Sequence, residues 1–496
     1  MSVFAVRLLL NRGLIFFSLW LALGFSASVY AGPWISPGDS ALRSDILVLS
    51  DAGVISAPVS TWPLSWGDIA ASLEESTDDL SPHELAAWAR LRRRADAAMV
   101  TDQGAFSGYA SLAENPRQIR TFEDGPREDA EIGIGFAWTG DWFALDLQGQ
   151  WVSDPLDGDE WRVDGSNVGV ALGNWMLAVG AMDRWWGPGW QGSLIWGNNA
   201  RPIPAISLGR NSTQAFQTKW LSWIGPWDLE LDWGFLEEER EIPNAQVFGM
   251  RWNFRPFSSL EVGLSRTALW CGDGQPCGLD TFIDVLAGSG TVNAFDHMGG
   301  YDIRWSGAVF GTPVALYAQW IGEDGEWLPS DFLGQFGAET SGHWDALGSY
   351  RFYLEWSDTE CDFRFRRSIR NDSGPGSPGC AYTNSLYRTG QHYKGKSFAH
   401  SFDGDASVFT LGGMLTDNSD YSWLATFAIG NINRRSARPN TVADNKTRYR
   451  EVALSHRRTI WIGELLAGVG FDYRKNTVTG IKDEDIRVYV EWGLSY

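Results

Sequence analysis

The side chains best suited to bind a ligand are concentrated between residues 184 and 201. This short segment combines tryptophans with arginines and neighbouring asparagines: Arg184, Trp185, Trp186, Trp190, Asn198, Asn199 and Arg201. Tryptophan rings stack on the C–H faces of sugars, and asparagine and arginine side chains form hydrogen bonds with sugar hydroxyl groups. Neither kind of contact requires a catalytic group. We therefore take these side chains as candidate carbohydrate-binding residues.

A structural role for the same segment is the alternative. The sequence Trp-Trp-Gly-Pro-Gly at 185–189 can form a turn whose backbone is fixed by glycine and proline while the rings pack inside the protein. Arg184 and Arg201 can brace carboxylates, because the chain carries 61 acidic against 40 basic residues. Charged side chains are rarely buried unless they are paired. The sequence alone leaves both roles open.

No other group of residues forms a convincing catalytic or metal-binding set. Gly38-Asp39-Ser40 has the composition of an esterase nucleophile segment, but it opens an amphipathic helix and is better explained as a cap. The acidic residues from Asp154 to Glu160 lack the spacing of a calcium-binding loop. Five of the six histidines are scattered and mostly in expected loops: His297, His343, His392, His400 and His456. The alternative of a hydrolase stays open, because catalytic residues that are far apart in sequence can meet in the folded protein. We predict a non-enzymatic protein without metal or cofactor.

The overall composition limits the class of protein. A net charge of −21 has the wrong sign for gripping nucleic-acid phosphates over a broad face, so no nucleic-acid partner is expected. Apolar residues, at 44%, suffice for a folded core. The 56 glycines and 28 tryptophans, with only 7 methionines, favour many short aromatic-rich strands over a helical enzyme.

Residues 1–31 have the pattern of an export signal. Arg7 and Arg12 precede an apolar stretch at 13–25, and small residues then lead to Ala31. The apolar stretch is shorter than the roughly 20 residues that a helix needs to span a bilayer. We therefore expect cleavage after Ala31 rather than a membrane anchor, and we expect the protein to leave the cytoplasm.

Export places the four cysteines in an oxidising compartment, where an even number favours disulfides. The most local pairing joins Cys271 to Cys277 and Cys361 to Cys380, each within a segment rich in turn-forming residues. A zinc site is disfavoured, because the sequence has neither a Cys-x-x-Cys motif nor clustered histidines.

The spacing of apolar residues divides the rest of the chain in two. Between 38 and about 100 the spacing is helical. One helix begins at the Asp39/Ser40 cap, a second begins at Trp66, and a third begins at Ser81-Pro-His-Glu84, which has the form of a capping box. We therefore predict a small helical domain at 32–105.

From 106 to 496 apolar residues recur at every second position, as in β-strands. The clearest example is 486–496, where valines, Trp492 and Leu494 share one face and Arg487 and Glu491 share the other. Comparable alternation occurs at 132–138, 143–151, 229–235, 248–254, 260–264, 314–320, 350–356, 423–429 and 461–473.

A soluble β-sandwich alternates in the same way, but a transmembrane barrel fits better. The apolar faces carry aromatic rings near the strand ends, where the girdles of outer-membrane barrels lie, and the opposite faces carry charges that suit a polar lumen. At roughly 20 residues per strand and connection, 106–496 holds about 18 to 20 strands, an even number. The predicted fold is all-β and transmembrane: a closed antiparallel outer-membrane β-barrel of about 18 strands with a small N-terminal α-helical domain.

Several motifs then resemble one known family, the Wzi-type capsule assembly proteins of Gram-negative outer membranes. The densest is Trp-Trp-Gly-Pro-Gly-Trp-Gln-Gly-Ser-Leu-Ile at 185–195. Shorter matching pieces occur in the family's order at 42–45, 49–55, 60–65, 200–202, 223–227, 254–261, 319–324 and 328–330. The resemblance implies an 18-stranded barrel with a helical bundle on its periplasmic side, and a lectin-like role. The cysteine-bearing loops do not match the family pattern.

The function predicted from these features is that of an outer-membrane lectin which attaches capsular or exopolysaccharide, acidic or neutral, to the cell surface. We expect a monomer whose partners are that polysaccharide and outer-membrane lipid. The alternative is a pore for small solutes, since a barrel of this size is wide enough for a channel unless it is filled.

Overall fold

The computed structural model describes residues 32–74, 77–287, 295–323, 331–361, 379–436, 440–461 and 463–495. The predicted export signal at 1–31, the motif at 328–330 and the terminal Tyr496 lie outside these residues.

Three helices near the N-terminus form where the sequence predicts them: α2 (Ser40–Asp51), α3 (Trp66–Ser72) and α4 (Pro82–Ala98). Asp39 caps α2, because its carboxylate accepts a hydrogen bond from the N–H of Leu42 at 2.9 Å. Ser81 and Glu84 form the predicted capping box of α4. None of the described helices is both long and apolar enough to cross a membrane.

The rest of the chain forms one closed antiparallel barrel of 18 long strands among the described residues. They are β4 (Gly104–Glu114), β5 (Ala130–Thr139), β6 (Phe143–Ser153), β8 (Asn167–Leu172), β9 (Trp175–Gly180), β11 (Ala205–Arg210), β12 (Trp227–Phe235), β13 (Gln246–Phe257), β14 (Leu260–Trp270), β15 (Asp296–Val309), β16 (Thr312–Glu323), β17 (Asp331–Trp344), β18 (Gly348–Asp358), β21 (Ser407–Thr416), β22 (Ser422–Ile432), β23 (Thr447–Ile460), β24 (Gly463–Asn476) and β25 (Lys482–Ser495). The two-residue strand β7 (Trp161–Arg162) adds to β6. The barrel closes where β25 pairs with β4.

The predicted class of fold is therefore confirmed, with small shifts in the element ends. The first barrel strand begins at Gly104, just before the expected boundary at 106. The strand expected from 461 begins at Gly463, because the chain turns at Trp461, whose φ is 55°.

Alternation along the strands puts polar side chains inside the barrel and apolar ones outside. On β14, for example, Ser265 and Thr267 are buried, whereas the neighbouring Leu264 is 41% exposed in the isolated protein. Outward-facing apolar side chains of this kind suit contact with lipid.

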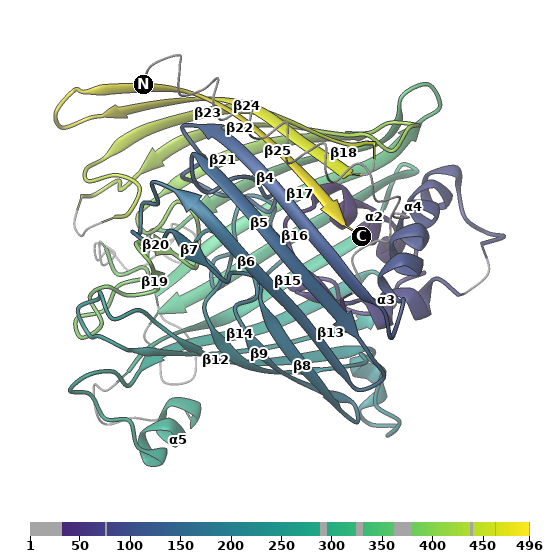
Figure 1. Ribbon diagram of the computed structural model, residues 1–496, viewed down its shortest axis with the longest axis horizontal. Helices are drawn as coiled ribbons and strands as arrows, with labels where there is room; N and C mark the ends of the chain where they lie inside the picture. The colour runs from purple at the N-terminus through teal and green to yellow at the C-terminus, as the bar shows by residue number, and fades with distance from the viewer. Residues whose placement is uncertain are drawn as a thin grey trace, which may run out of the picture.

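The two mouths of the barrel differ in the length of their connections. Helices α2, α3 and α4 lie at one mouth, where most strands are joined by short turns such as 258–259 and 310–311. The opposite mouth carries the long loops, which include β19 (His392–Tyr393), β20 (Lys396–Ser397) and α5 (Leu279–Ala287) (Figure 1). Both predicted disulfides, Cys271–Cys277 and Cys361–Cys380, are present in these long loops.

The barrel interior is filled from both mouths. An N-terminal segment (residues 54–65) enters beside the helices, and an inner loop (residues 181–204) connects β9 to β11. The two meet as a small sheet, in which β2 (Thr61–Trp62) pairs with β10 (Trp185–Trp186). A second small sheet joins β1 (Trp34–Ile35) to β3 (Leu64–Ser65).

Charged side chains of the barrel wall hold the N-terminal segment through its backbone. Glu261 accepts hydrogen bonds from the N–H groups of Val59 and Ser60 at 3.1 and 2.8 Å. Arg255 donates to the carbonyl oxygens of Ile55 and Ser50 at 2.6 and 3.0 Å. Hydrogen bonds to charged groups are stronger than neutral ones, so they fix this segment firmly inside the barrel.

Candidate functional site

The tryptophans predicted to contact sugar are enclosed by protein. Trp185, Trp186 and Trp190 are each at most 2% exposed. Trp185 lies opposite Trp62, and Trp190 stacks on Tyr353 of the barrel wall with ring centroids 5.4 Å apart. This burial supports the packing alternative for the three rings, and sugar contact by them remains a prediction.

Charged groups on both sides of the inner loop hold its turn. Glu355 on β18 accepts hydrogen bonds from the N–H groups of Trp190 and Gln191 at 2.7 and 3.0 Å. From the other side, Arg43 on α2 donates to the carbonyl oxygens of Pro188 and Gly189 at 2.8 and 2.7 Å. The turn is therefore clamped between the barrel wall and the helical domain.

Arg184 braces a carboxylate, as the structural alternative proposes. Its guanidinium lies 2.6 Å from Asp232 on β12 and donates to the hydroxyl of Ser207 at 2.7 Å. Both Arg184 and Asp232 are enclosed, at 1% exposure each.

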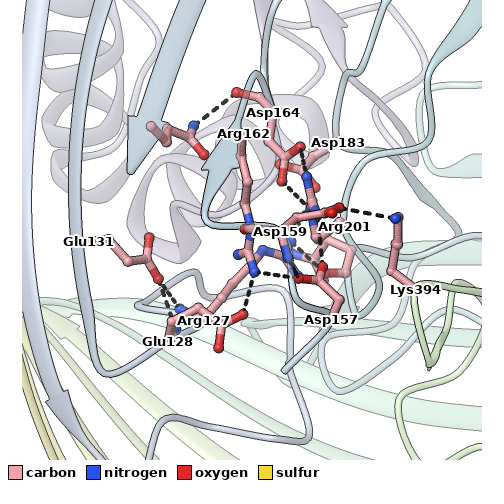
Figure 2. Close-up of polar contacts among 12 residues, drawn as sticks. Arg127, Glu128, Glu131, Asp157, Asp159, Arg162, Asp164, Asp183, Arg201 and Lys394 are labelled. Atoms are coloured by element: carbon pink, nitrogen blue, oxygen red, sulfur yellow. Dashed lines mark hydrogen bonds and ion pairs between the residues drawn. The ribbon is translucent and has the colours of Figure 1, made fainter. Parts of the chain in front are cut away.

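Arg201 is the centre of an acidic cluster at the mouth opposite the helices (Figure 2). Its guanidinium contacts Asp157, Asp159 and Asp164 at 2.7 to 2.8 Å. Burial raises the pKa of Asp157, but hydrogen bonding and charge attraction from Arg201, helped by Arg162, outweigh it and leave that pKa below its usual value. Arg201 is thus fully engaged by carboxylates.

The two asparagines connect this cluster to the neighbouring loops. The side-chain amide of Asn199 donates to the carbonyl of Ser397 at 3.0 Å and accepts from the N–H of Arg120 at 3.2 Å. Asn198 is also buried, and within the described residues its side-chain oxygen has no hydrogen-bond partner. Arg127 donates to the backbone carbonyls of both asparagines at 3.1 and 3.2 Å.

Beside the Arg201 cluster lies a solvent-open cleft of about 390 Å³. Its lining is mostly basic: Arg117, Arg120, Arg127, Glu128, Leu156, Asp157, Asn199, Arg201, Lys394 and Lys396. We call it the basic cleft.

Three cations of the basic cleft differ in how they are neutralised. Within the described part of the chain no carboxylate lies within 4.0 Å of the Lys396 ammonium group, which donates instead to the carbonyl and side-chain oxygens of Gln118 at 3.1 and 2.6 Å. The guanidinium of Arg127 lies 3.4 Å from the carboxylate of Asp183. Arg120 contacts Asp124, whose side chain is half exposed.

Burial and the mutual repulsion of these cations lower the pKa values of Lys396 and Arg120. Burial, then the charges of Arg120 and Arg127, lower the pKa of Lys396 to about 8. Burial and the nearby Arg127 lower the pKa of Arg120 to about 9. An anion bound in the basic cleft would relieve this repulsion.

Sequence reasoning missed Arg120, Arg127 and Lys396. The available signal was the run of arginines at 117–127, between two strands of an otherwise acidic chain. Lys396 carried no such signal, because it reaches the cleft from a loop far along the chain.

The hydrolase alternative gains no support from the close contact between His392 and Asp403 at this mouth. Nε2 of His392 lies 3.0 Å from Asp403, but Nδ1 lies against the backbone carbonyl of Thr389. Both ring nitrogens are therefore occupied and neither activates a hydroxyl. In the described ranges no cluster of His, Cys, Asp and Glu has the geometry of a metal site.

Comparisons with known proteins agree on one family. The family model "Capsule assembly protein Wzi" matches residues 109–416. An uncharacterised 55.8 kDa protein in the cps region of Klebsiella pneumoniae is 32% identical over 350 residues, which are 69% of this chain and 68% of that protein.

A solved structure resembles the whole fold. It is that of Wzi from Escherichia coli, an outer-membrane protein involved in group 1 capsule assembly and described as a carbohydrate-binding β-barrel. The superposition has a TM-score of 0.80 at 26% identity and covers 93% of this chain and 99% of that one.

Proposed function

The chain belongs to the Wzi family of capsule assembly proteins, and from this premise we propose that it binds an extracellular polysaccharide and holds it at the cell surface. It is an outer-membrane β-barrel. The proposed role is binding without catalysis, which the absence of a catalytic arrangement around His392 in the described chain supports. The proposal includes a monomer surrounded by lipid, because closure leaves the described barrel strands no free edge to which a second barrel could pair.

The helical domain, predicted at 32–105 and ending where β4 begins at Gly104, faces the periplasm in this proposal. Outer-membrane barrels have short periplasmic turns and longer extracellular loops. The short turns of this barrel lie at the mouth that carries α2, α3 and α4, and the long loops lie at the other (Figure 1). The basic cleft then opens to the cell exterior, where a surface polysaccharide is found.

The basic cleft is the observation that carries the proposal, and it also points to an acidic glycan. In a chain of net charge −21, it gathers Arg120, Arg127 and Lys396 without a full set of partner carboxylates. A glycan carboxylate would pair with them, while Asn199 lies at the same surface. Two of the candidate carbohydrate-binding residues, Arg184 and Arg201, are instead paired with carboxylates such as Asp232 and Asp164.

The alternative of a solute pore is the weaker one. The N-terminal segment and the inner loop occupy the lumen and are bound to its wall by Glu261 and Glu355. The inner loop also contributes large buried side chains to this filling, those of Trp185, Trp186 and Trp190.

Deleting the gene should move most of the polysaccharide from the cell surface into the medium. Synthesis does not depend on a surface tether, so the total amount should remain unchanged. Cell-bound and released polysaccharide are measured separately after centrifugation, with a strain complemented by the intact gene as control. An unchanged partition between cells and medium would refute the proposed function.

Lys396→Gln should weaken binding of an acidic polysaccharide about tenfold, because a hydrogen bond to a charged group contributes roughly 1.5 kcal/mol. Wild-type affinity should also fall as pH rises through about 8, where Lys396 loses its proton and its attraction for an anion. The variant should lack this step in the pH profile. Binding is measured by calorimetry with the purified barrel.

Lys446→Gln is the matched control, since it removes the same charge from an exposed position in a neighbouring loop. A carboxyl-reduced form of the same polysaccharide should bind wild type weakly and show no pH step. If the two variants bind equally well, the basic cleft is not the binding site.

A further inference from the structure

Helix α5 lies outside the barrel, next to the rim that carries the long loops (Figure 1). It follows the Cys271–Cys277 disulfide, which ties the start of its loop to the end of β14. The sequence Leu-Asp-Thr-Phe-Ile-Asp-Val-Leu-Ala is mostly apolar, although the loop lies at the mouth that is extracellular in the orientation proposed above.

One face of α5 packs on the outer surface of the barrel wall. Phe282 contacts the rings of Trp233, Phe248 and Trp270, with centroids 5.2 to 5.6 Å apart. These three rings point outward, because they alternate with lumen-facing neighbours such as Asp232 and Val247. The helix therefore covers part of the surface that faces lipid elsewhere on the barrel.

Arg266 shows that α5 extends below the rim. Its side chain faces outward, since its neighbours Ser265 and Thr267 point into the lumen. Its guanidinium donates to the carbonyl of Leu286, in the last turn of α5, at 2.9 Å. A cation is favourable at a helix C-terminus. Arg266 lies four residues before the end of β14, or about 13 Å along the strand.

The opposite face of α5 is apolar and uncovered. Leu279, Ile283 and Leu286 are spaced so that they share one side of the helix, and they are 74%, 54% and 44% exposed. Asp280 and Asp284 lie between them in sequence and together on one side of this face. The uncovered face thus continues the apolar outer surface of β12, β13 and β14.

We propose that α5 is an interfacial helix embedded in the outer leaflet of the outer membrane, with Leu279, Ile283 and Leu286 in contact with lipid acyl chains. Its inner face sits on lipid-facing rings, and its C-terminal end meets an outward arginine that would otherwise meet hydrocarbon, which is unfavourable. A helix with one face on an apolar wall and the other exposed at the same depth is surrounded by the membrane. The inference is independent of polysaccharide binding.

Fluorine NMR on the full chain in lipid nanodiscs tests this placement. A trifluoromethyl-phenylalanine is placed singly at Ile283 and, in a second variant, at Leu279. Reference positions are Leu411, which faces outward on β21, and Arg388, whose side chain is 73% exposed in a loop. The broadening agents are phosphatidylcholine spin-labelled at carbon 5 of its acyl chain and, separately, a water-soluble gadolinium chelate.

The fluorine signals at 283 and 279 should be broadened by the spin-labelled lipid and not by the gadolinium chelate. The signal at 411 should behave in the same way. Arg266→Gln, which removes the hydrogen bond to Leu286, should increase the broadening of the 283 signal by gadolinium. Heat-modifiable migration in SDS confirms that each variant is folded. Labels at both positions that behave like the one at 388 would place α5 in water and overturn the proposal. Protection from both agents would mean that protein covers the helix, which also overturns it.

Discussion

Replacing Trp185 and Trp186 together by alanine should open the barrel interior to ions while the β-barrel itself stays folded. Each buried Trp→Ala change costs about 3–5 kcal/mol, and both fall on the small sheet that joins the inner loop to the N-terminal segment. The strands keep their own hydrogen bonds, so heat-modifiable migration should persist. Planar-bilayer recordings should change from silent for wild type to conducting for the double variant.

Trp423→Ala with Trp461→Ala is the matched control, because both rings are exposed on the outside of the protein. This variant should remain silent in bilayers. If the Trp185/Trp186 variant is also silent but no longer retains polysaccharide, the two rings contact sugar directly in the wild-type protein, and the packing role is wrong.

Arg251→Met should lower the free energy of unfolding by about 3–5 kcal/mol, the usual loss when one partner of a buried ion pair is removed. Arg251 is fully buried, with hydrogen bonds to Asp302 at 2.6 and 3.0 Å. It also donates to Thr61 and Ser60 of the N-terminal segment at 2.6 and 2.9 Å. The variant therefore leaves Asp302 unpaired and loosens the filling of the barrel. Urea unfolding in lipid vesicles measures the loss.

Adding Asp302→Asn to Arg251→Met should recover much of that stability, because the unpaired charge is then gone. Arg458→Met, at an exposed position, should have little effect. Equal stability of the single and double variants would show that the N-terminal contacts of Arg251, and not the ion pair, dominate its contribution.

Local patterns predicted the elements of this fold well, because each depends on near neighbours in sequence. The Asp39 cap needs only Leu42, and alternation along β14 needs only the pleat of a strand. The class of barrel followed from those alternations and from the family motifs.

The roles of the candidate site residues could not be predicted in the same way. Whether Trp185 is buried depends on Trp62, which comes from another part of the chain. The basic cleft depends on Lys396 meeting Arg120 and Arg127 from a distant loop. Likewise, the apolar stretch of α5 is too short to distinguish from a core segment until Arg266 and Trp233 are seen beside it.

The filling of the barrel has a consequence for how the chain assembles. The seam between β25 and β4 joins the last strand to the first, so until β25 arrives the growing sheet has two unpaired edges that favour aggregation. Such distant pairing is slow to form. Arg255 and Glu261 belong to β13 and β14, the eighth and ninth of the 18 long strands described, and bind a segment that precedes every barrel strand. The contacts of Arg255 and Glu261 with the N-terminal segment can therefore form before the strands after β14 are in place. Those strands can then curve around the filled interior before β25 pairs with β4.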